Sequence, residues 1–318
     1  MTNALPKVGI LGFGKMGRNH ARVLSSLTTV EAVGFFDPNL TDGDFFGFKQ
    51  HESVDSLLEK VDYVVISSPT SLHSELAIKA SLGHVHCLIE KPLAASVSEA
   101  EEVLRAFQAS DAKSALGMIE RFNPALRVLK QKIDQGLVGQ IFQISTRREG
   151  PFPDRISDVG VGLDLASHDL DLVQWLLGSK VAELQVETSS WKGRNFEDYF
   201  LTSGKTTSGC LVGNSVNWRN PKKYRSVTVY GELGVLEADA LGMTLTLNQM
   251  GEPLSNWDAI QWLKGPREGD SISFGIPKIE PLVAEHLAFL RLIETGDPGD
   301  LSTLSEGLAV LRLLLEKG

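Results

Sequence analysis

Cysteine, clustered basic residues and long apolar runs are all scarce in this chain of 318 residues. The two cysteines, Cys87 and Cys210, lie far apart with no C-x-x-C spacing. They predict buried thiols in a reducing compartment, and neither a disulfide framework nor a cysteine metal site. No apolar run approaches membrane-spanning length, and the N-terminus lacks a charged segment followed by an apolar one. We therefore expect a cytoplasmic protein with no membrane partner.

The charge balance is acidic, with 31 Lys and Arg against 40 Asp and Glu, a formal net charge of −9 and a pI near 5.3. Neutralising nucleic-acid phosphates needs clustered cations, and no block of Lys and Arg supplies them, so we expect no nucleic-acid partner. The length, with 42% hydrophobic and 22% charged residues, suits two packed domains better than one.

The first 120 residues alternate between apolar runs and segments with helical periodicity. Successive strands are predicted in KVGILGFG, VEAVGFFD, DYVVISSPT, VHCLIE and SALGMI, with helices between them. Continuous apolar strands separated by helices indicate a parallel sheet covered on both faces. We predict an α/β fold whose residues 1–119 form a doubly wound Rossmann domain.

A glycine-rich turn follows the first of these strands and opens a helix. Its residues are Gly12, Phe13, Gly14, Lys15, Met16 and Gly17. A G-x-G-x-x-G pattern is weak alone, but this context is typical of dinucleotide binding, where the glycines allow a tight turn, close approach of a pyrophosphate and close helix packing. The helix N-terminus then offers unpaired amides to the phosphates. The alternative is an ordinary glycine turn.

Asp37 ends the second predicted strand, in FFDPN. A carboxylate there accepts hydrogen bonds from the ribose hydroxyls and repels a 2′-phosphate, so we predict NAD in preference to NADP. An aspartate that merely starts a turn before Pro38 remains the alternative.

Two further strands end at the same carboxyl edge, where ligands of open α/β sheets bind. Ser68, Pro69 and Thr70 follow the third strand, and Glu90, Lys91 and Pro92 end the fourth. Ser68, Pro69, Thr70, Glu90 and Lys91 are predicted to contact the cofactor, and Pro92 to fix the backbone of the lysine. His20 and His73 lie near the starts of helices facing this edge, where each either touches the cofactor or packs and caps.

After about Glu120 the pattern changes to strands of period two, including IFQISTRRE, KVAELQVETSSW and RSVTVYGELGVLEAD. Such alternation predicts an open, mainly antiparallel sheet with one face covered. We assign residues 120–318 to an α+β domain for substrate binding and oligomerisation, with loop from Leu247 to Ile279. The uncovered face would suit a homodimer or homotetramer.

Asp164 and His168 lie four residues apart on a predicted helix that ends at Gly178. Histidine titrates near neutrality, and a carboxylate on the same helical face can orient it, which favours a general base. The pair could also ligate a metal, but the third and fourth ligands are missing, so we predict no metal site. Simple packing or capping by His168 is a third possibility.

Arg147, Arg148 and Arg155 surround the rigid turn GPFP. Arginine forks bind diphosphates well, so this cluster could hold a nucleotide-linked substrate. Pairing with the nearby Glu149, Asp154 and Asp158 is the competing interpretation.

Together the stretches GFGKMGRNHA, FFDPN, IEKPLA, ERFNP and GVGLDLASHDLDL resemble the Gfo/Idh/MocA family of NAD(P)-dependent oxidoreductases. The resemblance runs the length of the chain. It implies a Rossmann domain, a second mainly antiparallel domain, a catalytic Lys91, and an active-site pair at Asp164 and His168, where the family pattern has glycine at Ala166. We also predict substrate contacts from Asn123, Arg148 and Arg155, together with Lys91, Asp164 and His168. The stretch RREGPFPDRI is similar to the family's sugar-nucleotide branch of UDP-N-acetylglucosamine 3-dehydrogenases.

We therefore expect an oxidoreductase that moves a hydride between NAD and a secondary alcohol of a sugar, with a nucleotide sugar as substrate. Two alternatives stay open: a dehydrogenase of a free polyol or sugar, and a non-catalytic dinucleotide-binding regulator. Turnover would distinguish an enzyme from the non-catalytic regulator. Competition by UDP would distinguish a dehydrogenase of a nucleotide sugar from one of a free polyol or sugar. Fold alone does not identify the substrate.

Overall fold

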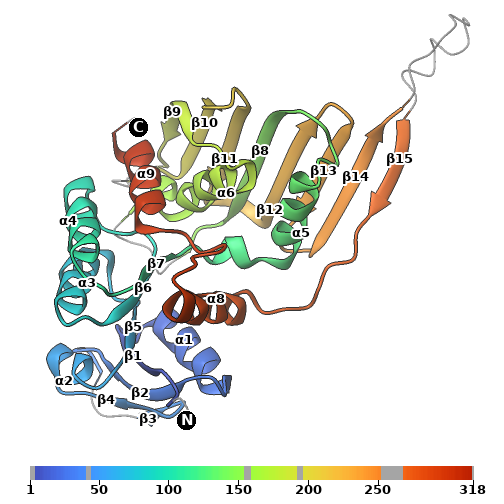
Figure 1. The fold of residues 1–318 in the computed structure, drawn as a ribbon. Helices are drawn as coiled ribbons and strands as arrows, with labels where there is room; N and C mark the ends of the chain where they lie inside the picture. The colour runs from blue at the N-terminus through green and yellow to red at the C-terminus, as the bar shows by residue number, and fades with distance from the viewer. Residues whose placement is uncertain (1–3, 41–43, 154–158, 192–195, 252–267, 317–318) are drawn as a thin grey trace, which may run out of the picture. The chain divides into compact units, whose positions relative to one another are not determined.

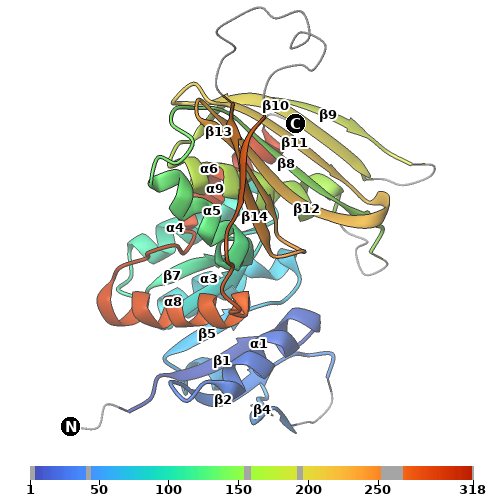
Figure 2. The same cartoon turned by 90° about the vertical axis from the view of Figure 1, so that its right-hand side faces the viewer.

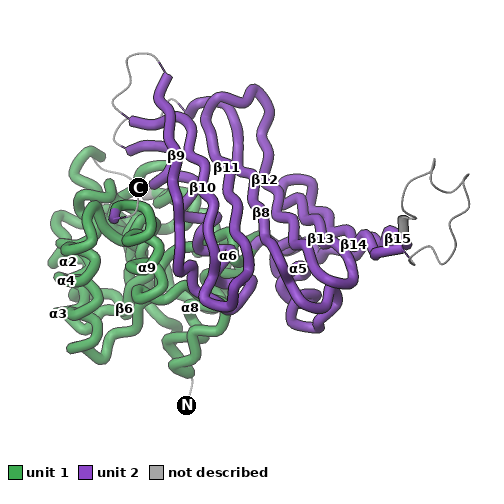
Figure 3. The backbone as a smooth tube through the Cα atoms, turned by 90° about the horizontal axis from the view of Figure 1, so that it is seen from above, with its two compact units in different colours: residues 1–122, 280–315 green, residues 123–279, 316–318 purple. Residues whose placement is uncertain are grey.

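The computed structural model describes residues 4–40, 44–153, 159–191, 196–251 and 268–316. The chain forms two compact units, shown in different colours in Figure 3. The first comprises residues 1–122 and 280–315, and the second comprises residues 123–279 and 316–318.

The first unit contains a seven-stranded sheet in the order β3-β4-β2-β1-β5-β6-β7. The strands are β1 (Lys7–Leu11), β2 (Glu31–Phe36), β3 (Asp44–Phe45), β4 (Phe48–Gln50), β5 (Tyr63–Ile66), β6 (His86–Glu90) and β7 (Ser114–Gly117). All pairings are parallel except the one between β3 and β4. The chain leaves β1 toward β2 on one side and returns to β5 on the other. The predicted Rossmann-like sheet is confirmed, with its switch point beside β1.

The short strands β3 and β4 were not predicted from the sequence. They form a hairpin whose turn residues Phe46 and Gly47 both have positive φ, at 58° and 82°. Positive φ is uncommon for a residue with a side chain, so the turn signal was weak at Phe46. The hairpin extends the sheet beyond β2.

The N-terminal part of the first unit contains the helices α1 (Lys15–Ser26), α2 (Val54–Leu58), η1 (Thr70–Leu72), α3 (His73–Leu82), α4 (Val97–Gln108) and η2 (Ile119–Phe122). Two of them, α2 and α4, begin at serine capping residues. Ser53 and Ser96 each form a capping box with the residue three positions on, which satisfies two backbone amides that the helix itself leaves unpaired.

The last two helices correct the predicted domain assignment of residues 280–315. Helices α8 (Pro281–Thr295) and α9 (Leu304–Leu315) belong to the first unit. Phe289 of α8 is fully buried and packs on Tyr63, with ring centroids 5.6 Å apart. The backbone amide of Leu116 donates to the carbonyl of Ser302 at 2.8 Å, and the Arg121 side chain donates to the carbonyl of Leu301 at 3.3 Å. Helical periodicity reveals an apolar face but not which sheet that face covers.

The second unit contains an eight-stranded sheet in the order β15-β14-β13-β12-β8-β11-β10-β9. The strands are β8 (Ile141–Pro151), β9 (Val181–Ser189), β10 (Tyr199–Thr206), β11 (Leu211–Asn217), β12 (Arg219–Gly231), β13 (Gly234–Asp239), β14 (Thr244–Met250) and β15 (Glu268–Ser273). Only β8 and β11 pair in parallel, so the predicted mainly antiparallel sheet is confirmed. The predicted loop from Leu247 to Ile279 is wrong at both β14 and β15, and residues 252–267 lie outside the described part.

One face of this sheet carries α5 (Pro124–Asp134), the π-helical turn η3 (Gly162–Ala166) and α6 (Ser167–Leu177) (Figures 1 and 2). Alternate strand residues such as Ile144, Val229 and Leu236 point to this face and are fully buried. Burying each contributes about 1.5–3 kcal/mol. Among the described residues, no helix is both long and apolar enough to cross a membrane.

Candidate functional site

The glycine turn between β1 and α1 has the geometry that its sequence predicts. Gly12 has φ +88°, and a Cβ there would lie 2.4 Å from the backbone nitrogen of Ser68. A Cβ on Gly17 would lie 2.2 Å from the carbonyl oxygen of Gly12. Both positions therefore require glycine.

Gly14 differs from its two partners because a Cβ there would meet nothing within 4 Å. It is the N-cap of α1, whose first turn contains no acidic residue. Lys15 is exposed and Met16 is half-buried. The amides at the start of α1 thus face open space, with a partial positive charge that suits a phosphate group. These residues fit a dinucleotide pyrophosphate.

Phe13 and Asp37 connect this turn to β2. The Phe13 ring is buried and stacks on Phe35 at 4.0 Å, so it packs in the core, and its backbone amide donates to Oδ2 of Asp37 at 2.7 Å. Oδ1 of Asp37 accepts from the amide of Asn39 at 2.9 Å. Asp37 therefore starts a turn and also braces the glycine loop. Each carboxylate oxygen has a second lone pair that a ribose hydroxyl could use.

His73, predicted to contact the cofactor, is buried between two loops of the same edge. Its Nδ1 lies 2.8 Å from the carbonyl oxygen of Pro92, and its Nε2 lies 2.9 Å from that of Ser68. Burial lowers the pKa of His73, outweighing the two carbonyls and Glu90, which raise it. The neutral ring donates to one carbonyl at a time. His73 thus positions the Ser68–Thr70 and Glu90–Pro92 segments.

Lys91 directly follows β6 and is half-buried, and its peptide bond to Pro92 is cis. Gly12, Asp37, Ser68 and Lys91 all follow the carboxyl ends of parallel strands, so the first unit collects the predicted cofactor residues at one sheet edge.

In the second unit, Asp164 lies within the π turn η3, and His168 lies in the first turn of α6. The backbone amide of Gly162, at the start of η3, donates to Oε1 of Glu197 at 2.9 Å. A Cβ on Gly162 would lie 2.6 Å from the ring of Phe200. Short π segments are frequent at functional sites. Glu197 holds the start of this one, a role that no local sequence pattern indicated.

The predicted arginine cluster is divided by the pleat of β8. Arg148 points to the helix-covered face, where its Nε donates to Oδ1 of Asp169 at 2.9 Å, with side chains 4% and 2% exposed. Successive strand residues point to opposite faces, so Arg147 lies on the uncovered face. Arg155 lies outside the described residues. Arg147 and Arg148 therefore cannot grip one group between them.

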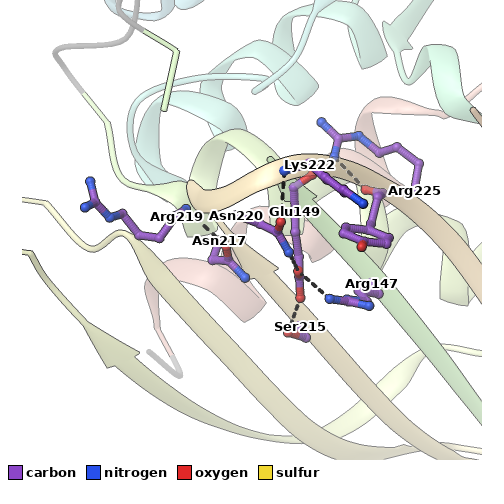
Figure 4. Close-up of polar contacts among 9 residues, drawn as sticks. Arg147, Glu149, Ser215, Asn217, Arg219, Asn220, Lys222 and Arg225 are labelled. Carbon is purple, nitrogen blue, oxygen red and sulfur yellow. Dashed lines mark hydrogen bonds and ion pairs between the residues drawn. The ribbon is translucent and has the colours of Figure 1, made fainter. Parts of the chain in front are cut away.

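On the uncovered face, Arg147 is part of a polar cluster centred on Glu149 (Figure 4). The Glu149 carboxylate accepts from Arg147 at 2.8 Å and from Asn220 at 2.6 Å. The hydrogen bond from Arg147 lowers the pKa of Glu149, against burial, which raises it. The Arg147 guanidinium also lies 4.0 Å from the centre of the Tyr224 ring. These contacts match the competing interpretation, in which the arginines pair internally.

Asn123, predicted as a substrate contact, is used by the fold. Its Oδ1 accepts from the amides of Ala125 and Leu126 at the start of α5, and its Nδ2 donates to the carbonyl of Ala240 at 3.0 Å. Nothing in this geometry supports a substrate contact. Among the described residues, no group of three or more His, Cys, Asp or Glu side chains could hold a metal ion.

Two sequence models of one oxidoreductase family match this chain. A model described as an oxidoreductase family with an NAD-binding Rossmann fold matches residues 6–118, and the Gfo/Idh/MocA C-terminal domain matches residues 126–237. The chain belongs to the Gfo/Idh/MocA family.

Individual relatives carry several substrate names. A UDP-N-acetylglucosamine 3-dehydrogenase of Acidithiobacillus ferrooxidans is 33% identical over 183 residues, 56% of each chain. A glucose-6-phosphate 3-dehydrogenase of Bacillus subtilis is 32% identical over 144 residues, 44% of this chain and 41% of the relative. The chain thus spans about half the length of these curated relatives. A crystal form of the Acidithiobacillus enzyme superposes with a TM-score of 0.84 at 25% identity, covering 99% of this chain and 97% of that one.

Proposed function

We propose that this protein is an NAD-dependent dehydrogenase that transfers a hydride between nicotinamide and a secondary alcohol or ketone of a sugar. The observation that carries the proposal is the edge of the first sheet, where the open Gly14 and the unobstructed start of α1 adjoin Asp37 in a chain of this family. A phosphate fits the space at Gly14 and the start of α1, and a ribose fits beside the Asp37 carboxylate.

NAD is preferred to NADP because Asp37 ends β2 beside the glycine turn. A second negative charge on the ribose 2′-oxygen would repel this carboxylate. Asp37→Asn should therefore improve the ratio of NADP to NAD turnover, and an unchanged ratio would contradict the assignment.

The residues of the chain divide the chemistry between them. The nicotinamide supplies the hydride acceptor when it is bound. His168 takes the hydroxyl proton as the alcohol becomes a ketone, and Asp164 orients its ring and stabilises the charge that it gains. Lys91 donates a hydrogen bond to the developing alkoxide. In the reverse direction His168 returns the proton to the alcohol oxygen.

For the substrate we propose a nucleotide sugar, supported by the similarity to the UDP-N-acetylglucosamine 3-dehydrogenase along almost the whole chain. A free or phosphorylated sugar is the second candidate. It is favoured by the internal pairing of Arg147 with Glu149 and of Arg148 with Asp169, which occupies two of the three predicted diphosphate ligands.

The test is the absorbance of reduced nicotinamide after adding UDP-N-acetylglucosamine, glucose, glucose 6-phosphate or myo-inositol to protein and NAD. A single-turnover assay covers any cofactor that stays bound. Reduction by the nucleotide sugar, inhibited by UDP, would support the first candidate. Reduction only by the other compounds would replace it with the second, and no reduction at all would refute the dehydrogenase.

Lys91→Ala should abolish turnover and leave NAD affinity nearly unchanged. Lys79→Ala is the matched control, because Lys79 forms an exposed pair with Asp55 on α2 and exposed pairs contribute only about 0–1 kcal/mol. Loss of NAD binding with the chemistry retained would contradict the role of Lys91.

We also propose that the uncovered face of the second sheet joins two copies of the chain. Tyr199 and Leu201 lie two residues apart on β10, point to this face and are 40% and 53% exposed, which is unusual for neighbouring large apolar side chains. Light scattering should show a dimer or tetramer that Leu201→Glu dissociates. A monomeric wild type would refute this proposal.

A further inference from the structure

Four ionisable side chains gather in the first unit beside the turn that carries Lys91. They come from α1, from the end of β6 and from α8, which lies beside α1 (Figure 1): His20, Glu90, Glu285 and His286. His20, Glu285 and His286 are fully buried, and the Glu90 side chain is 12% exposed. Burying so many polar groups is costly unless they bond to one another.

Two hydrogen bonds connect three of these groups in a row. Nδ1 of His20 lies 2.9 Å from Nε2 of His286, and Nε2 of His20 lies 2.9 Å from Oε1 of Glu90. A carboxylate only accepts, so His20 carries a proton on Nε2. If His286 carries its proton on Nε2 as well, both bonds are donated in one direction, from His286 to His20 to Glu90.

Burial favours the uncharged forms of two of these groups, Glu285 and His286. Burial is the main cause that raises the pKa of Glu285 well above its usual range, and Glu90 adds to it. Glu285 therefore favours its protonated form. Burial is also the main cause that lowers the pKa of His286 well below its usual range, and His20 adds to it. The His286 ring therefore favours its neutral form. Glu90, which bonds to His20, directly precedes Lys91 in the chain.

Joining α1 to α8 does not require buried histidines. Arg22 on α1 and Glu280 at the start of α8 already form an ion pair on the surface, and apolar side chains of both helices share one core cluster. Replacing buried polar groups by apolar ones is often neutral or stabilising. The two hydrogen bonds are therefore better explained by a role in holding the turn at Glu90 and Lys91, where they end.

We propose that His20 and His286 are positioning residues of the dehydrogenase: they form a directed hydrogen-bond chain that fixes the Glu90 carboxylate and, through it, the backbone turn bearing Lys91. The proposal rests on the proposed function. It also couples two parts of the cofactor edge, because His20 lies on the helix that begins at the glycine turn.

The kinetic test compares His20→Leu, His20→Gln and Arg22→Gln in the purified full chain. Small displacements of a catalytic group can cost about 100-fold in rate, so we expect His20→Leu to lower kcat at least about tenfold with KM for NAD nearly unchanged. Glutamine can donate to Glu90 and accept from His286, so it should restore most of kcat. Arg22→Gln, which breaks only the surface pair, should leave kcat unchanged. A His20→Leu variant that loses thermal stability but keeps kcat would overturn the proposal, as would a glutamine variant as slow as the leucine one.

A second measurement needs no substrate. Long-range ¹H–¹⁵N correlation spectra of protein labelled in its 7 histidines report the tautomer of each ring, and His20→Gln and His286→Gln assign the signals. Both rings should be Nε2–H tautomers at neutral pH. An Nδ1–H tautomer of either ring, or a doubly protonated His20, would overturn the directed chain. If the wild type reduces no sugar, the proposed function fails, while the tautomers still decide the hydrogen-bond chain. If His20→Leu does not fold, His20→Gln and the spectra decide.

Discussion

The buried pair of Arg148 and Asp169 offers a direct test of whether this arginine serves the fold or the substrate. Both side chains are almost fully buried, at 4% and 2% exposure. Removing one partner of a buried ion pair leaves an uncompensated charge and costs about 3–5 kcal/mol. For a unit of this size each kcal/mol lowers Tm by about 2–4 °C, so Asp169→Leu should lower Tm by about 6–20 °C.

The double variant Arg148→Met/Asp169→Leu should recover most of that loss, because two apolar side chains of similar volume leave no buried charge. The same substitutions at the exposed pair of Arg291 and Asp297 provide the comparison. There the two side chains are 66% and 50% exposed, and the single variants should cost about 1 kcal/mol or less beyond lost packing. Calorimetry of the four single and two double variants measures these differences.

Substrate kinetics of the double variant then decide the role of Arg148. If the arginine serves only the fold, KM for the active sugar should stay close to the wild-type value. If it binds a diphosphate, losing a charge-assisted hydrogen bond of about 1.5–3 kcal/mol should raise KM for the nucleotide sugar about 10–150-fold. A stable double variant with that higher KM would refute the structural interpretation.

Three further predictions follow from single contacts. Glu285→Gln should be more stable than the wild type, by a margin that grows as pH rises above about 4.3. Above that pH the unfolded wild type loses the Glu285 proton while the folded wild type keeps it, which costs the wild type up to about 1.4 kcal/mol per pH unit. Urea midpoints of the two proteins that stay parallel across this range would contradict the prediction. Gly12→Ala should weaken NAD binding and lower Tm, since its Cβ would strike the backbone of Ser68; calorimetric titration with NAD measures the first effect, and wild-type affinity would refute it. Arg121→Met should reduce stability at neutral pH more than near about pH 3. Burial raises the pKa of Glu306, but Arg121 and Thr303 outweigh burial and lower this pKa below its value in the unfolded chain. The stabilisation by Arg121 is therefore present above the unfolded pKa and is lost as pH falls through the folded pKa. Equal losses at both pH values would show that the pair contributes nothing.

Features that depend on local backbone geometry were predictable from the sequence. Gly12 and Gly17 leave no room for a Cβ, and Ser53, Ser96 and Asn123 cap the helices that follow them. The close approach of Ser68 to Gly12 comes from the end of the neighbouring strand β5, whereas for the caps, for Gly17 and for the positive φ of Gly12 the cause lies within a few residues. The same holds for the alternation that predicted the second sheet.

The contacts that the sequence missed join distant residues. Arg148 and Asp169 are 21 positions apart, and His20 and His286 are 266 apart. Nothing in a single sequence says that α8 returns to the first sheet, so neither the placement of residues 280–315 nor the buried histidine pair could be inferred. The placement of Arg147 and Arg148 on opposite faces of the sheet, by contrast, could have been inferred, because successive side chains of a strand such as β8 alternate between the two faces.

The turn at the end of β6 shows how these distant contacts act on a local motif. Lys91 lies between Glu90, whose carboxylate bonds to His20 of α1, and Pro92, whose carbonyl bonds to His73 of α3. Both helices begin at the carboxyl edge of the sheet, one at the glycine turn and the other just after Ser68–Thr70. The lysine turn is thus held on each side by a buried histidine from a helix that starts at the proposed cofactor site. Because both neighbours of Lys91 are fixed in this way, the backbone of the turn is held in place, and the side chain of Lys91 is the part of the turn that can still adjust.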